Sequence, residues 1–134
     1  MKIGKLSVIV LLLVFLLSCG DNGPRVYTSI SGAWRCQEIN PFLGNRVYLV
    51  EIDRKASDTT QYVITNFYDS GDLEYIVVKL KNGQLTLAQQ PTADLSVKSF
   101  TGTLVDTGFK RIELTYKVYD GLRDVSSEAV LTRQ

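Results

Sequence analysis

The sequence of 134 residues contains no histidine, only two cysteines, three prolines and a single tryptophan. Without histidine the protein cannot use Ser-His-Asp or Cys-His catalysis, bind zinc through imidazole, or change conformation with pH through protonation of a histidine. Charge of one sign is not in excess either, because 15 Lys and Arg stand against 14 Asp and Glu. A balanced charge gives no reason to expect nucleic acid as a partner.

Long hydrophobic runs are also missing after the first twenty residues. The apolar run from Leu6 to Leu17 is 12 residues long and is interrupted only by Ser7, so it is shorter than the roughly 20 residues that cross a bilayer as a helix. Lys2 and Lys5 precede it, as in the charged region of a secretion signal. The rest of the chain is long enough for one small domain, and 45% hydrophobic residues give that domain a core.

The residues that follow the apolar run, Leu16-Leu17-Ser18-Cys19-Gly20, resemble the lipobox of bacterial lipoproteins. The resemblance implies a signal peptide at residues 1–18, cleavage before Cys19, and a membrane anchor of several acyl chains on Cys19. Because Gly20 rather than aspartate follows the cysteine, the resemblance implies the outer membrane of the cell envelope. An ordinary signal peptide or membrane anchor with a coincidental Cys19 is the alternative, and the side of the membrane stays open.

Residues 19–31 are polar and include Gly23-Pro24, so we predict a flexible linker there. From Gly32 onward, alternating apolar residues and turn residues recur about every 12 positions, and helical spacing is absent. We therefore predict one all-β domain over residues 32–134. Its predicted strands are Ala33–Asn40, Arg46–Arg54, Gln61–Tyr68, Leu73–Lys81, Gln84–Gln89, Leu95–Val105, Phe109–Tyr119 and Val125–Arg133.

Short connections predict that each strand pairs antiparallel with the next, and closure into an eight-stranded up-and-down barrel removes exposed edges. A sandwich is the alternative. Gly32-Ala33-Trp34 resembles the G-x-W motif of lipocalin-like (calycin) barrels. The resemblance implies that Trp34 plugs the closed base and that an arginine near the end of the last strand, here Arg133, packs on it.

Bulky residues occupy most of the strand positions whose side chains are predicted to point into the barrel. We therefore predict a mostly packed interior. These positions are Trp34, Tyr48, Val50, Ile52, Ile76, Val78, Leu80, Leu85, Leu87, Phe100, Leu104, Ile112, Leu114, Tyr116, Val118 and Leu131. Cys36 shares the phase of Trp34, and with Cys19 lipidated it has no disulfide partner. We expect a buried thiol in a monomeric protein; a reactive thiol is the alternative.

With Trp34 at the base, the mouth of the barrel is surrounded by residues 41–45, 69–72, 90–94 and 121–124. Phe42 and Leu43 in the first of these loops are apolar residues at positions expected to be exposed to solvent. They could cover a pocket, contact a partner, or fold back over the core rim. Any pocket should be shallow and near the mouth.

No catalytic, metal or cofactor site is predicted. The acidic loop at residues 69–72 lacks the alternating carboxylates of a calcium loop and is interpreted as a turn. Glu51 and Asp53, two residues apart on one strand face, are interpreted as solvent-exposed. We predict a non-enzymatic binding module for a small apolar or amphipathic ligand. The alternative is a protein-interaction or inhibitor lipoprotein with a solid barrel, and enzymatic activity ranks third.

Overall fold

The computed structural model of the protein describes residues 23–89 and 95–134. The predicted signal peptide at residues 1–18, Cys19 and the predicted mouth loop at residues 90–94 lie outside these ranges. Within the described ranges, no helix has the length and apolar character that crossing a membrane requires.

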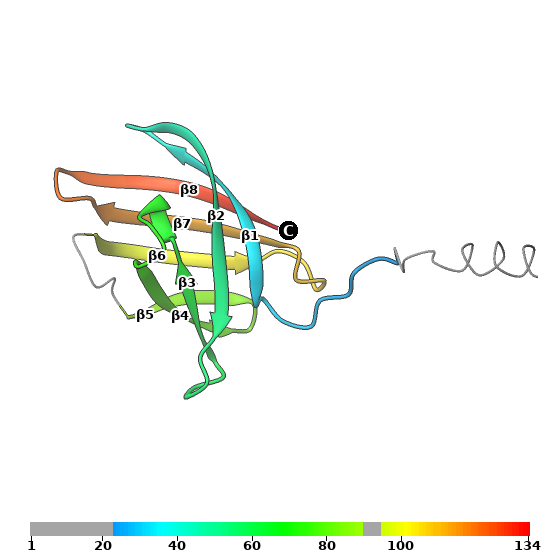
Figure 1. Ribbon diagram of the computed structural model, residues 1–134. Coiled ribbons are helices and arrows are strands. Elements are labelled where there is room, and N and C mark those ends of the chain that lie inside the picture. The colour runs from blue at the N-terminus through cyan, green and yellow to red at the C-terminus, as the bar shows by residue number, and fades with distance from the viewer. Residues whose placement is uncertain (1–22, 90–94) are drawn as a thin grey trace, which may run out of the picture.

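Eight antiparallel strands form a closed barrel in which each strand pairs with the next and the last pairs with the first. Figure 1 shows the strands in this order around the barrel. Their bounds are β1 (Gly32–Asn40), β2 (Gly44–Arg54), β3 (Gln61–Thr65), β4 (Tyr75–Lys81), β5 (Gln84–Gln89), β6 (Ser96–Leu104), β7 (Arg111–Tyr119) and β8 (Asp124–Arg133). The predicted up-and-down barrel is confirmed, and closure of β1 onto β8 excludes the sandwich.

Alternating burial along the strands explains why the sheet closes. In β7 every even-numbered residue is buried and every odd-numbered residue is exposed, and in β1 the even-numbered residues from Trp34 to Asn40 are buried. Because successive side chains of a strand point to opposite faces, each strand presents one inward and one outward set. Curling the sheet on itself buries the inward set of every strand.

One predicted strand is wrong at its end. The strand expected to reach Tyr68 stops at Thr65, because Asn66, Tyr68 and Asp69 adopt left-handed conformations with φ values of 60°, 63° and 56°. Extended pairing cannot continue through such residues. Instead Phe67–Asp69 forms a short 3-10 turn, η2, between β3 and β4. All other predicted strand bounds agree with the structure within two residues.

The barrel interior is packed, as the inward phase predicted. All residues predicted to point inward belong to one core cluster or pack against it, with Leu80, Leu87 and Leu104 only partly buried. Gly102 shows how tight the packing is. A Cβ atom added there would lie 2.8 Å from Leu85 Cβ and 2.9 Å from Leu114 Cδ2, so glycine is the residue that fits.

Candidate functional site

The base of the barrel holds the two residues that the G-x-W resemblance paired. Trp34 is fully buried, and the guanidinium carbon of Arg133 lies 4.8 Å from the centroid of its ring. The same guanidinium lies 4.2 Å from the ring centroid of Tyr27. Arg133 thus contacts two aromatic rings, one in β1 and one in the segment before it.

The segment before β1 is bound to this base. Arg133 Nη1 and Nη2 donate hydrogen bonds to the carbonyl oxygens of Ile30 (3.0 Å) and Ser29 (2.9 Å). Trp34 Nε1 donates to the same Ile30 oxygen at 2.9 Å. The Ile30 side chain is fully buried, so the packed domain begins before the predicted boundary at Gly32.

Cys36 lies inside the barrel as a free, buried thiol. In the strand register it is opposite Tyr48 of β2 and Leu131 of β8. Burial raises the pKa of the Cys36 thiol to about 11. At neutral pH the group is therefore a protonated thiol inside the core, which is a poor nucleophile.

We expect the stability of the fold to fall in alkaline solution through Cys36. The thiol pKa is about 11 in the folded protein against a reference value of 9.0, so the folded state holds this proton more tightly. Its contribution is complete below pH 9 and is lost as the pH rises through 11, amounting to about 3 kcal/mol. Urea unfolding across this window should therefore show a smaller decline for Cys36→Ala than for the wild type. An identical decline in both proteins would contradict the prediction.

The mouth of the barrel is closed from within by η2. Phe67 and Tyr68 are both buried. The ring of Phe67 meets those of Tyr116 and Phe100 edge to face, with centroids 4.9 Å and 5.9 Å apart. Tyr68 also packs edge-on against Tyr116. These two aromatic residues, which sequence reasoning had placed in a strand, fill the position where a ligand would enter the interior.

A buried ion pair lies beside this plug. Glu38 of β1 has no exposed side-chain surface, and its Oε2 is 2.7 Å from Arg46 Nη2 of β2, whose side chain is 19% exposed. The carboxylate also accepts hydrogen bonds from Tyr48 Oη (2.9 Å) and Asn40 Nδ2 (2.9 Å). Burial alone would lower the pKa of Arg46, but the Glu38 carboxylate and the neighbouring tyrosines raise it overall, so the guanidinium stays charged.

The pair also holds the plug in place. Arg46 Nη2 donates to the carbonyl oxygen of Tyr68 at 3.2 Å, and its guanidinium carbon lies 4.6 Å from the Tyr68 ring centroid. Asn40 Nδ2 donates to Tyr68 Oη at 3.1 Å. The network therefore ties the inner faces of β1 and β2 to η2 across the mouth.

Above the plug, an open hollow of about 330 Å³ remains at the mouth. Its lining residues are Arg46, Tyr68, Asp69, Ser70, Glu74, Leu95 and Asp120. Arg46 Nε and Glu74 Oε2 are buried and have no hydrogen-bond partner among the described residues. An unpaired donor and an unpaired acceptor in one hollow are the groups that a polar ligand would satisfy.

Negative charge dominates this hollow. Its lining includes the carboxylates Asp69, Glu74 and Asp120, whereas its one cation, Arg46, is already paired with Glu38. Hydrogen bonds from the backbone amides of Leu122 and Arg123 lower the pKa of Asp120. The hollow therefore favours a positively charged group.

Phe42 and Leu43 lie at the tip of the β1–β2 connection and are 52% and 55% exposed. They neither line the hollow nor fold over the core rim. The ring of Phe42 is covered by the Arg123 guanidinium at 4.4 Å, and both backbone amides donate to Asn40 Oδ1. The loop is thus held in place, and about half of the surface of each apolar side chain stays exposed to solvent.

Exposed apolar side chains continue from this tip along the outer faces of β1 and β2. Ile39, Val47 and Leu49 are each more than half exposed. Together with Phe42 and Leu43 they form what we call the outer apolar face. A face of this kind is a common feature of protein-interaction surfaces.

The remaining acidic candidates show no sign of a metal centre. Within residues 23–89 and 95–134, no three Cys, Asp or Glu side chains are grouped as metal ligands. Glu51 and Asp53 are exposed on the outer face of β2. Of the loop at residues 69–72, Asp69 and Ser70 line the mouth hollow.

Sequence reasoning missed Glu38, Arg46 and Glu74. A signal existed, because Glu38 shares the inward phase of Trp34 and Cys36, and Arg46 shares that of Tyr48. A charged residue in an inward phase predicts a buried partner of opposite charge. Glu74 also shares the inward phase of Ile76 and Val78 in the predicted strand Leu73–Lys81, although in the structure it lies between η2 and β4.

Comparisons with known protein families, with curated proteins and with solved structures found no match.

Proposed function

We propose that the protein is a lipid-anchored, lipocalin-like lipoprotein of the bacterial outer membrane whose barrel binds a small amphipathic ligand without catalysing a reaction. The lipobox at Leu16–Cys19 supports the anchor. The closed barrel with Trp34 and Arg133 at its base supports the lipocalin-like assignment. The observation that carries the binding proposal is the mouth hollow with its unpaired Arg46 Nε and Glu74 Oε2.

The lining of the hollow supports a particular ligand chemistry. Three carboxylates favour a ligand with an ammonium group, and Glu74 Oε2 would accept its hydrogen bond. Arg46 Nε would donate to a carbonyl or hydroxyl oxygen on the same ligand. Leu95 supplies an apolar wall. Since η2 closes the interior, the ligand binds above the plug and not beside Trp34, and a purely apolar ligand would leave the carboxylates unpaired.

A pair of matched probes tests this proposal. Phenethylammonium carries an aromatic ring and a positive charge, and phenylethanol has the same ring with a neutral hydroxyl. In calorimetric titrations we expect the ammonium compound to bind more tightly. Glu74→Gln should weaken its binding about tenfold or more, because a charge-assisted hydrogen bond is lost.

The control variant is Asp58→Asn, which removes a partly exposed carboxylate in the β2–β3 loop at the opposite end of the barrel. It should leave binding unchanged. Equal binding of the two probes, or unchanged ammonium binding by Glu74→Gln, would contradict the proposed ligand class. Nuclear magnetic resonance shifts at Tyr68 and Leu95 would locate the bound probe.

The outer apolar face supports a second candidate function, docking of an envelope protein by a solid barrel. Five apolar side chains exposed on one side of the mouth are the observation that favours it. Phe42→Ser with Leu43→Ser should then abolish binding of the partner and leave binding of phenethylammonium intact. Unchanged partner binding by this variant would contradict the docking function.

A further inference from the structure

We propose that the base of the barrel docks onto anionic lipid headgroups of the membrane that holds Cys19, so that the mouth faces away from the bilayer. This inference rests on the proposed lipidation of Cys19. It concerns the end of the barrel opposite the ligand hollow and does not depend on ligand binding.

A basic groove lies at the base. It has a volume of about 320 Å³ and is lined by Pro24, Arg25, Tyr27, Lys110, Thr132 and Arg133. Three of its six lining residues are cationic and none is acidic. Groups of lysine and arginine next to a membrane attract phosphate-bearing anionic lipids.

The cations of this groove form no ion pair with described carboxylates, and Glu51 is the carboxylate that interacts with Arg133 at longer range. Arg25 and Lys110 are exposed and form no ion pair with any residue in the described ranges. Arg133 donates its two Nη groups to backbone carbonyl oxygens and so keeps its full charge. Asp106, in the same loop as Lys110, accepts hydrogen bonds from the backbone amides of Lys110 and Arg111 and keeps its negative charge, but it forms no ion pair with Lys110 and does not line the groove.

The length of the tether places this groove near the bilayer. Tyr27 is fixed to the base through Arg133, and it follows Cys19 by eight residues. Even fully extended, eight residues span at most about 29 Å. Figure 1 shows that the described part of the tether meets the barrel at the end opposite the β7–β8 turn. The base is therefore the part of the barrel that the anchor holds against the membrane.

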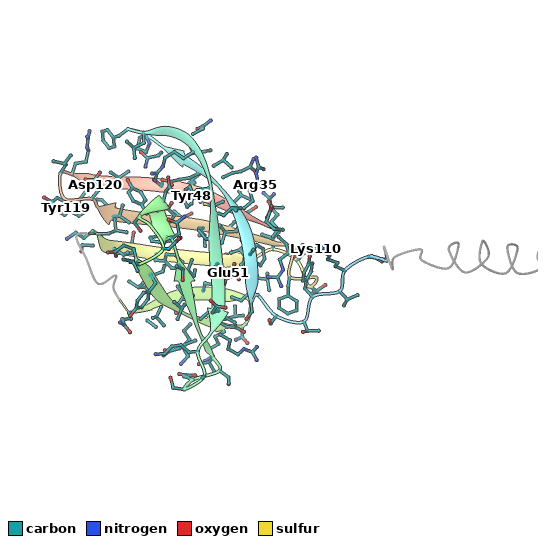
Figure 2. All side chains as sticks on the ribbon, in the orientation of Figure 1. Arg35, Tyr48, Glu51, Lys110, Tyr119 and Asp120 are labelled. Carbon is teal, nitrogen blue, oxygen red and sulfur yellow. The ribbon has the colours of Figure 1, made fainter. Side chains whose placement is uncertain are left out.

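The charges lining the hollows at the two ends of the barrel favour the same orientation. Figure 2 shows Lys110 at the tethered end and Asp120 at the far end. Asp120 belongs to the acidic mouth hollow, which an anionic surface repels, whereas the basic groove is attracted. Val26, 86% exposed beside Arg25, adds an aliphatic side chain that can enter the headgroup layer.

Lipid quenching of a fluorophore tests the docking. The acylated full-length protein, labelled through Thr107→Cys at the base, would be reconstituted in vesicles whose headgroups carry a nitroxide quencher. Buried Cys36 stays unlabelled. We expect stronger quenching in vesicles containing phosphatidylglycerol than in pure phosphatidylcholine, and weak quenching of a Leu122→Cys label at the mouth in both.

Paired charge variants provide the control. Arg25→Gln with Lys110→Gln should lower the ratio of docked to undocked barrels roughly 25-fold, about fivefold per basic residue. Lys98→Gln with Lys117→Gln removes the same charge from the mouth half and should leave the ratio unchanged.

Mass spectrometry of Cys19 distinguishes failure of the proposed lipid anchor from failure of the proposed docking. If Cys19 is acylated but phosphatidylglycerol does not increase quenching at Thr107, the docking is overturned and the proposed anchor stands. If the two charge-variant pairs lower the ratio equally, the basic groove is not the docking surface. An unmodified Cys19 would overturn the anchor and the docking with it, leaving the ligand test at the mouth unaffected.

Discussion

Trp34→Ala is expected to lower the free energy of unfolding by about 3–5 kcal/mol, a large share of the 5–15 kcal/mol that typically stabilises a domain. The ring is fully buried at the barrel base, so its removal leaves a cavity that the closed strands cannot fill. It also removes the Nε1 donor to the Ile30 oxygen and one surface on which Arg133 packs. Urea or thermal unfolding measures the loss.

Two further variants show whether this loss arises at the base contact. Tyr119→Ala removes a large ring that is 39% exposed at the mouth and should cost far less. Arg133→Ala should destabilise less than Trp34→Ala, and the two together should cost less than their sum because the side chains touch. Strict additivity in a double-mutant cycle would show that the contact carries no energy.

Arg46→Ala is expected to cost about 3–5 kcal/mol, because it leaves the Glu38 carboxylate buried without a countercharge. Glu38 has no exposed side-chain surface, and the hydrogen bonds from Tyr48 and Asn40 cannot replace a guanidinium. The plug loses its hydrogen bond from Arg46 to Tyr68 as well. Chemical unfolding should therefore show one of the largest effects of any charged residue in the chain.

The matched control is Arg111→Ala, which breaks the ion pair with Glu113. Both of those side chains are about half exposed, and such a pair contributes about 0–1 kcal/mol. Adding Glu38→Gln to Arg46→Ala should recover part of the lost stability, because the unpaired charge disappears. Equal costs for Arg46→Ala and Arg111→Ala would contradict a buried ion pair.

The strands of the barrel could be predicted from the sequence because the patterns that identify each strand involve only neighbouring residues. Alternation in β7, the turn residues between strands and the inward phase of Trp34 each follow from a few neighbouring residues. Arg133 could be placed near Trp34 because a closed antiparallel barrel brings the start of its first strand beside the end of its last. The register pairs these two residues directly.

The plug and the mouth hollow could not be predicted in this way. Phe67 and Tyr68 match a strand pattern, and the left-handed backbone of Tyr68 is rare for a bulky residue. That conformation persists because Arg46 and Asn40 bond to Tyr68 from other strands. A feature stabilised by distant residues leaves no local pattern in the sequence.

The pairing of β1 with β8 also determines when the protein can fold. Arg133 and the Ile30 oxygen that it contacts are 103 residues apart in the sequence, so the sheet cannot close until every strand from β1 to β8 is available for pairing. Folds dominated by such distant pairings form slowly, because the entropy of closing a long loop is lost before the contacts are gained. Until β8 docks, β1 and β7 each expose an unpaired edge that can join another chain. A chain that ends before β8 would keep both edges open and would be prone to aggregate.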